Sequence, residues 1–172
     1  MEYVFCSTIT DPAHLDGIRQ LLTQYDDAFF PPITGRPSTA QAVAKGGKAG
    51  GIEAYLKSML PTPCVMLMEG DRVAGFLSYL LNYSSWHIPE QYLPNVYIGT
   101  ILIHEDFRGK KLAESVYTAL AAHHPGHALC TRTWSANDAH ITVLKNLGFR
   151  ELLRQKDHRG PGIDTVYYIK EA

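Results

Sequence analysis

Hydrophobic positions near the N-terminus change from a strand-like run to helical spacing. Residues 3–9 form a largely apolar run, which predicts a strand. Asp11-Pro12 follows it, and this pair is typical of a helix start because Asp caps free N–H groups and Pro fits the first turn. The apolar positions with helical spacing are Leu15, Ile18, Leu22 and Tyr25. We therefore expect a first helix that runs to about Tyr25.

The next segment, DDAFFPPITGRPS, is rich in proline and aromatic residues. It cannot continue the helix because Pro31, Pro32 and Pro37 remove backbone donors and block the preceding turn. A weak helix is expected over 39–44, and the glycines at 46, 47, 50 and 51 interrupt it. Helical spacing returns between Ile52 and Met59, which predicts a second helix.

The middle of the chain predicts a hairpin, a long loop and a central strand. The runs CVMLME and RVAGFLSYLL are joined by Gly70-Asp71, a hairpin signal. Residues 82–94 are polar, aromatic and interrupted by proline, so we expect a loop. The apolar run at 101–103 predicts a strand, and a charged turn over 105–110 leads directly into a helix. That helix has Leu112, Val116, Ala119 and Leu120 on one face.

The C-terminal part continues the alternation of helices and strands. HHPG at 123–126 ends the preceding helix, and ALCTRTW predicts a strand. Asn137 is suited to cap a helix that ends at Gly148, and strands are expected at 149–154 and 165–170. The element order is therefore that of a mixed α/β fold.

Composition limits the classes of protein that this chain can represent. With 172 residues, of which 45% are hydrophobic, we expect a single domain over 1–172. A net charge of -1 excludes a global field that attracts nucleic acid or a membrane surface. Cys6, Cys64 and Cys130 lie in apolar runs without metal-binding spacing, which favours buried thiols in a reducing compartment. We see no signal-peptide pattern and no apolar run near the roughly 20 residues of a membrane span, so we expect a cytoplasmic protein.

The tight passage from strand to helix over 101–120 predicts an anion site. So short a turn points the free N–H groups of the first helical turn toward the end of the strand. Arg108, Lys110 and Lys111 add positive charge there. This pattern favours a ligand that carries phosphate.

Two motifs give the chain a resemblance to a known family. IHEDFRGKKLA resembles the acyl-CoA signature of the GNAT superfamily of N-acetyltransferases, which reads Arg or Gln, two residues, Gly, any residue, then Gly or Ala. Arg108 and Ala113 fit its ends and Gly109 fits a common variant, whereas Lys111 stands where the central Gly is expected. SANDAHITVLKNLGF, residues 135–149, resembles the C-terminal helix motif of the family.

The resemblance implies a fold, a reaction and a cofactor. The fold is a mixed, largely antiparallel central sheet of six or seven strands flanked by about four helices. The reaction is acetyl transfer from acetyl-CoA to a primary amine of a small molecule, amino acid derivative or peptide, by direct attack in a ternary complex. A backbone amide near Leu102 would stabilise the oxyanion. The implied cofactor-binding residues are Ile101, Leu102, Ile103, Arg108, Gly109, Lys110, Lys111, Leu112, Ala113, Asn137 and Leu144.

Proton transfer is where the chain departs from the family. Many members have a tyrosine as general acid at the position of Leu144. His140, on the same helical face, is our candidate substitute, and the alternative is a partly buried histidine bonded to backbone. A strand glutamate that some members use as base is replaced by Tyr97. The nearest candidates to take the amine proton are Asp26, Asp27 and Tyr97, although the acidic pair equally fits a solvated helix end.

Aromatic residues in the expected loops are candidates for the acceptor site. Phe29, Phe30, Tyr79, Tyr83, Trp86 and His87 suggest a pocket for a compact, partly apolar ligand. Arg36 would bind a carboxylate. Our substrate-binding candidates are Asp26, Phe29, Phe30, Arg36, Tyr79 and Trp86. The alternative is loop packing or a dimer contact. The stretch from Phe29 to Arg36 also resembles the Phe-Val-Pro-Pro-Leu-Ser-x-Arg segment of a bacterial GNAT subgroup.

A second hypothesis remains open beside the enzyme. Lys111, Leu144 and the missing strand glutamate are compatible with a non-catalytic CoA-binding sensor or interaction domain of the same fold. We expect no metal site, because His123, His124 and His127 fit a loop that ends a helix. A homodimer is possible, and Asp164 fits either a structural role or a place in the site.

Overall fold

The computed structural model describes residues 1–35 and 50–172. These residues form two compact units. Unit 1 comprises Met1–Tyr79 and Gly99–Leu112, and unit 2 comprises Leu80–Ile98 and Ala113–Ala172. The expected single domain over 1–172 stays a prediction, and the helix expected over 39–44 lies outside the described residues.

The strands of the described residues form one seven-stranded sheet in the order β1-β2-β3-β4-β5-β7-β6. β4 and β5 pair in parallel, whereas β1–β2, β2–β3, β5–β7 and β6–β7 are antiparallel. The bounds are β1 (Glu2–Cys6), β2 (Cys64–Glu69), β3 (Arg72–Leu81), β4 (Asn95–Ile103), β5 (Ala128–Trp134), β6 (Arg150–Gln155) and β7 (Thr165–Lys170). The mixed, largely antiparallel sheet is therefore confirmed.

The α-helices of the described residues are α1 (Pro12–Gln24), α3 (Gly51–Met59), α4 (Leu112–His123) and α5 (Asp138–Asn146). The expected caps are present, because Asp11 accepts from the N–H of Ala13 and Asn137 accepts from the N–H of His140. Two strand bounds were predicted wrongly. β1 ends at Cys6 rather than at residue 9, and β4 begins at Asn95, several residues before the apolar run from which it was predicted.

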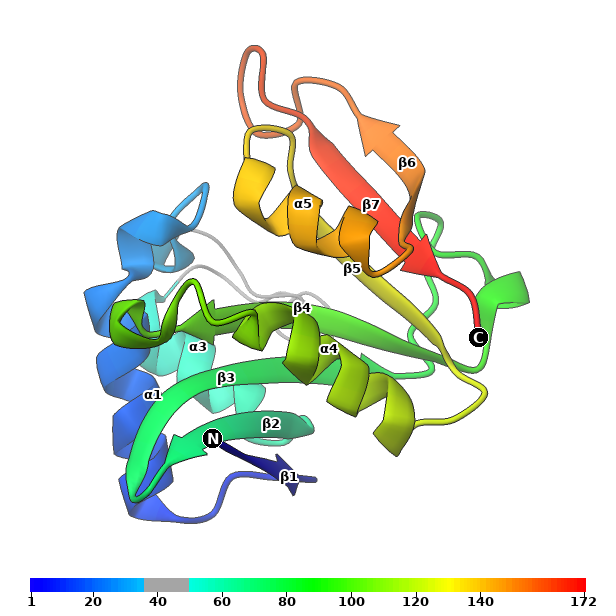
Figure 1. The fold of residues 1–172 in the computed structure, drawn as a ribbon. Helices are drawn as coiled ribbons and strands as arrows, with labels where there is room; N and C mark the ends of the chain where they lie inside the picture. The colour runs from blue at the N-terminus through cyan, green and yellow to red at the C-terminus, as the bar shows by residue number, and fades with distance from the viewer. Residues whose placement is uncertain (36–49) are drawn as a thin grey trace. The chain divides into compact units, whose positions relative to one another are not determined.

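The core of unit 1 lies between α1, α3 and one face of the strands beside them (Figure 1). Alternate residues of β2, namely Cys64, Met66 and Met68, belong to it, as the period of a strand requires. α1 approaches β3 closely at Gly17, where an added Cβ would lie 2.6 Å from Cγ2 of Val73. The other helical core residues are Ile18, Leu21, Leu22, Tyr25, Tyr55, Leu56 and Met59.

The core of unit 2 uses both faces of its strands. One face carries a cluster of Ile88, Tyr97, Ala128, Cys130, Tyr167 and Ile169, to which the loop before β4 contributes. Tyr117 of α4 contacts His140 of α5, with 2.9 Å between the hydroxyl and Nε2, and its ring lies edge-on to Phe149, at 5.7 Å between centroids. Figure 1 shows α5 lying along β5 and β7.

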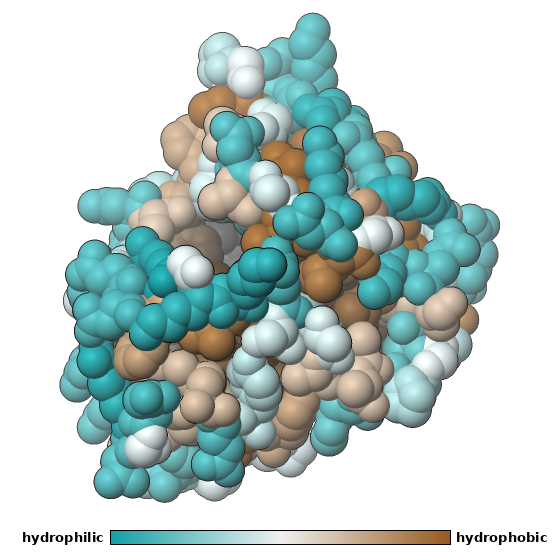
Figure 2. All heavy atoms as spheres, viewed as in Figure 1, coloured by the Kyte–Doolittle hydropathy of each residue, from teal (hydrophilic) through white to brown (hydrophobic). Residues whose placement is uncertain are grey.

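Polar atoms cover much of the face seen in Figure 2, and apolar atoms are visible between them in patches. The exposed large hydrophobic residues are Met1, Phe30, Leu81, Trp86 and Leu93. Among the described residues, no helix has the length and hydrophobicity needed to cross a bilayer. The three cysteines are free thiols; Cys64 and Cys130 are buried and Cys6 is half-buried.

Candidate functional site

The loop between β4 and α4 has the backbone geometry of an anion site. A short 3-10 helix, Glu105–Phe107, is followed by Arg108 and Gly109, with φ of -69° and +75°. Lys111 again has positive φ, 57°, directly before α4 begins at Leu112. In turns that combine residues of negative and positive φ, neighbouring backbone N–H groups point to one side, and an anion can bind there. The lysine at the expected glycine position thus adopts a glycine-like conformation.

The cations of this loop are exposed, and Arg108 is held at one edge only. Its Nε donates to the carbonyl oxygen of Ile103 at 3.1 Å, and its guanidinium carbon lies 4.7 Å from the ring centroid of Tyr25. Among residues 1–35 and 50–172, no acceptor is found for its two Nη atoms. Lys110 lies over the ring of Phe107, with Nζ 5.2 Å from the centroid. The outer edge of Arg108 can therefore bind an anion in two-point fashion.

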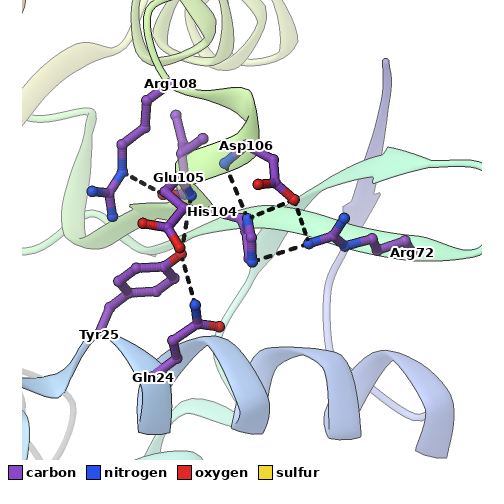
Figure 3. A network of polar contacts seen from close by, with 8 residues as sticks. Gln24, Tyr25, Arg72, His104, Glu105, Asp106 and Arg108 are labelled. Atoms are coloured by element: carbon purple, nitrogen blue, oxygen red, sulfur yellow. Dashed lines mark hydrogen bonds and ion pairs between the residues drawn. The ribbon is translucent and has the colours of Figure 1, made fainter.

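A charged network supports the start of the loop (Figure 3). Nη2 of Arg72 lies 3.1 Å from Oδ2 of Asp106 and 3.0 Å from Nε2 of His104. Nδ1 of His104 lies 3.2 Å from the amide N of Asp106. A neutral imidazole has a single acceptor nitrogen, so one tautomer cannot make both contacts as hydrogen bonds. The ion pair between Arg72 and Asp106 needs no particular tautomer.

The end of β4 before this loop has one accessible face. Gly99 is exposed and Ile101 and Ile103 keep accessible surface, whereas Thr100 and Leu102 are buried. Thr100 is hydrogen-bonded to the hydroxyl of Tyr55. The side chain of Leu102 belongs to the core of unit 1, so any part it plays in chemistry belongs to its backbone amide.

The expected cofactor contacts from α5 are largely structural. Asn137 accepts from the N–H of His140 at 3.4 Å and donates to Oγ1 of Thr133 at 3.0 Å. Leu144 is fully buried. We therefore correct the prediction for Leu144, because its side chain offers no surface to a ligand.

His140 also differs from the sequence interpretation. Its Nε2 lies 2.9 Å from the hydroxyl of Tyr117, which is itself buried. Desolvation lowers the pKa of His140 to about 4. At neutral pH the ring carries no imidazolium proton to donate, so we do not retain it as the general acid. Its partner is a side chain rather than the backbone, so the alternative interpretation was also inaccurate.

The candidate proton acceptors lie in different surroundings. Asp26 accepts from the N–H and the hydroxyl of Thr34, at 3.0 and 2.6 Å, and so joins two short 3-10 helices, Asp26–Ala28 and Ile33–Gly35. Asp27 is exposed. Tyr97 is buried in unit 2, with its ring centroid 4.5 Å from that of Tyr83. Asp164 accepts from Arg154 at 2.9 Å and from the N–H of Asp157, which is a structural role.

The aromatic acceptor-site candidates do not share one environment. Tyr79 lies in β3, as the run RVAGFLSYLL predicted, but it is 4% exposed, so its place among the exposed loop aromatics was wrong. Phe29 packs against the core of unit 1, whereas Phe30 is 38% exposed. Trp86, in unit 2, is 72% exposed. Arg36 lies outside the described residues.

Sequence reasoning missed two residues that the structure makes prominent. Tyr25, predicted only as a helical core position, contacts the loop after β4 through its hydroxyl and its ring. Arg132 is a cation within β5, with Nη1 3.4 Å from the hydroxyl of Tyr167. A single charge inside the apolar run ALCTRTW was a signal for Arg132. No local pattern marks Tyr25, because its partner Glu105 is 80 residues away.

Comparison with known proteins gives a family. A model of the acetyltransferase (GNAT) family matches residues 25–149, which is most of the chain. A search of curated proteins found no match.

Solved structures show the same fold at low sequence identity. A GNAT-family protein from Desulfovibrio desulfuricans aligns with a TM-score of 0.69 at 14% identity, covering 99% of each chain. The ribosomal-protein-alanine N-acetyltransferase of Brucella melitensis has a TM-score of 0.63 at 16% identity, covering 98% of this chain and 99% of its own. The yncA protein of Salmonella typhimurium, solved with its cofactor acetyl-CoA, has a TM-score of 0.63 at 16% identity, covering 99% of this chain and 94% of its own.

Proposed function

Because the chain belongs to the GNAT acetyltransferase family, we propose that it is an N-acetyltransferase that uses acetyl-CoA. The acceptor is a primary amine of a small molecule, amino acid derivative or peptide, and it attacks directly in a ternary complex. The observation that carries the proposal is the loop at 108–111, with its outward guanidinium and its positive φ at Gly109 and Lys111. The acetyl-CoA of the Salmonella typhimurium structure is in line with this cofactor.

The residues present fit a CoA pyrophosphate. Arg108 has a planar donor edge directed away from its partner Ile103, and Lys110 and Lys111 are exposed beside it. The space around Gly109 is open, since an added Cβ would meet no atom within 4 Å. The accessible face of β4, formed by Gly99, Ile101 and Ile103, suits the pantetheine arm. Leu112 and Ala113 complete the cradle at the start of α4.

Acetyl-CoA supplies a thioester, and the chain supplies binding, orientation and charge stabilisation. A backbone amide near Leu102 is the proposed donor to the oxyanion, a dipole that needs no reorganisation. The amine must lose a proton first, because an alkyl amine has a pKa of about 10.4. Asp27 is the better placed of the acidic pair to accept it through water, since the carboxylate of Asp26 already accepts from Thr34. Tyr97 stays a candidate, but its burial limits it to a relay.

Thiol release from acetyl-CoA across a library of amines tests the function. We expect release above background for at least one class among polyamines, amino acid derivatives and peptide N-termini, with the acetylated amine identified by mass spectrometry. Tight binding of acetyl-CoA with no thiol release for any class would instead support the non-catalytic CoA sensor. Acetylation of a hydroxyl acceptor alone would contradict the N-acetyl assignment while keeping the family.

We also propose that the enzyme acts in the cytoplasm, without nucleic acid, as a monomer or homodimer. The free thiols of Cys6, Cys64 and Cys130 are in line with a reducing compartment. Light scattering coupled to gel filtration measures the oligomeric state. Nucleic acid that stays bound to the protein through gel filtration would contradict the proposal.

A further inference from the structure

Tyr25 contacts the loop after β4 with two different parts of its side chain (Figure 3). It ends α1 as the C-cap and is 9% exposed. Its hydroxyl oxygen accepts from the backbone N–H of Glu105 at 3.0 Å. Its ring lies under the guanidinium of Arg108, 4.7 Å from the guanidinium carbon to the centroid. One side chain therefore holds both the first residue of the loop and its exposed arginine.

The contact of the Tyr25 hydroxyl fixes the backbone of the loop at Glu105. The amide of Glu105 is at the start of a 3-10 turn, where an N–H has no partner within the turn itself. The hydroxyl of Tyr25 supplies that acceptor, and Nε2 of Gln24 donates to the same oxygen at 3.1 Å. The loop is thus anchored to α1 independently of any charge on Arg108.

The ring contact fixes the arginine. Stacking on Tyr25 and the hydrogen bond from Nε to Ile103 restrict the guanidinium on one face and one edge. Within the described parts of the chain, both Nη atoms on the opposite edge have no acceptor. An arginine side chain loses much rotamer freedom when it binds an anion, so fixing it beforehand lowers the entropic cost of binding.

We propose that Tyr25 is a positioning residue for the acyl donor, which presets Arg108 and its loop to receive the pyrophosphate. This inference rests on the proposed function. Tyr25 is also a core residue of unit 1. A purely structural role would lower stability and weaken every donor alike, whereas positioning acts only on donors that carry the pyrophosphate.

The test compares acetyl-CoA with acetyl-pantetheine, which lacks the pyrophosphate, by isothermal titration calorimetry on the full chain. Tyr25→Leu, which removes both contacts, should raise the Kd for acetyl-CoA about tenfold. Tyr25→Phe, which keeps the ring and loses the hydroxyl, should raise it by about threefold. The Kd for acetyl-pantetheine should stay unchanged in both variants. In an Arg108→Ala background Tyr25→Leu should cost less than it does alone, since the ring contact to Arg108 is already lost and only the hydroxyl contact to Glu105 remains to be removed.

Tyr92→Leu is the matched control. Tyr92 also carries an arginine over its ring, Arg150 at 5.9 Å, and a hydroxyl contact to it, but it lies in unit 2. This variant should bind both donors as the unmodified chain does.

Several results would overturn the inference while the proposed function stands. These are unchanged acetyl-CoA affinity in both folded Tyr25 variants, equal losses for the two donors, or additive losses from Tyr25→Leu and Arg108→Ala. If Tyr25→Leu fails to fold by circular dichroism, Tyr25→Phe alone decides between a selective and a general loss. Failure of the unmodified chain to bind acetyl-CoA would overturn the proposed function as well.

Discussion

Two polar networks, one in each unit, are built around a histidine, and their surroundings give them opposite properties. In unit 1, His104 lies between Arg72 and Asp106, two charged and largely exposed side chains. In unit 2, His140 contacts the hydroxyl of Tyr117 at 2.9 Å, and its backbone N–H donates to Asn137 at 3.4 Å. The network in unit 2 contains only neutral groups at neutral pH.

The comparison shows how solvent access sets what such a network can do. Exposed ion pairs contribute little to stability. The charged residues beside the loop of unit 1 can therefore rearrange to bind a ligand at little cost to folding. Buried neutral hydrogen bonds contribute through the cost of leaving any one of them unmade. Binding should therefore depend on the exposed charges of the loop in unit 1, Arg108 among them, and folding on the network in unit 2.

The largest expected effect is that of Arg108→Ala, which should change acetyl-CoA affinity strongly and stability little. Arg108→Ala should weaken acetyl-CoA binding about a hundredfold, because charge-assisted hydrogen bonds to the pyrophosphate are lost. The free energy of unfolding should change by less than about 0.5 kcal/mol, since the side chain is exposed. Calorimetric titration and urea unfolding measure the two quantities. Arg150→Ala, an exposed arginine of unit 2, is the control, and equal affinities for the two variants would contradict the site.

The converse variant is Tyr117→Phe. Removal of a buried hydroxyl leaves His140 without its partner, so unfolding should become easier by about 2 kcal/mol. Affinity for acetyl-CoA should change little. Urea unfolding followed by circular dichroism measures the loss, with Tyr92→Phe, which removes an exposed hydroxyl contact, as control. A free energy of unfolding equal to that of the control would show that the buried hydrogen bond of Tyr117 contributes nothing to stability.

A pH dependence of stability should arise from His140. Its pKa is lowered from 6.5 to about 4 by desolvation, so the unfolded chain binds the proton more readily. The stability from this group is present above pH 6.5 and is lost as the pH falls toward 4. Between pH 7 and pH 5 the loss should be on the order of 1–2 kcal/mol. His140→Gln should flatten this part of the urea-unfolding profile, and His127→Gln should not; identical profiles for both would contradict the assignment.

The smallest expected effect is on stability, and it comes from the backbone strain at Lys111 in the loop of unit 1. Lys111 has φ of 57°, a conformation that costs a residue with a Cβ about 1 kcal/mol and glycine little. Lys111→Gly should therefore change stability by no more than about 1 kcal/mol, in the stabilising direction, since the greater freedom of glycine in the unfolded chain offsets part of the gain. Thermal unfolding measures it. Lys110→Gly, without positive φ, should destabilise, and the same sign for both variants would contradict the argument.

Local patterns were sufficient for most elements. The spacing of apolar residues, Asp11-Pro12, Gly70-Asp71 and Asn137 predicted helices, a hairpin and caps that the structure contains. Prediction was poorest where a role depends on packing. Tyr79 was expected to be accessible to a ligand and is buried in β3, and His140 looked like an acid and is a neutral partner of Tyr117.

The sequence by itself determined the fold class and the family and predicted the loop proposed to bind an anion, because each depends on patterns of residues close along the chain. Periodicity, caps and the run from Arg108 to Ala113 are all of this kind. Only the tertiary structure decided which side chains support that loop. Tyr25 reaches Glu105 from 80 residues away, and the pKa of His140 is lowered because folding surrounds the ring with other elements. Solvent exclusion and long-range contact are properties of the packed chain, and no short pattern encodes them.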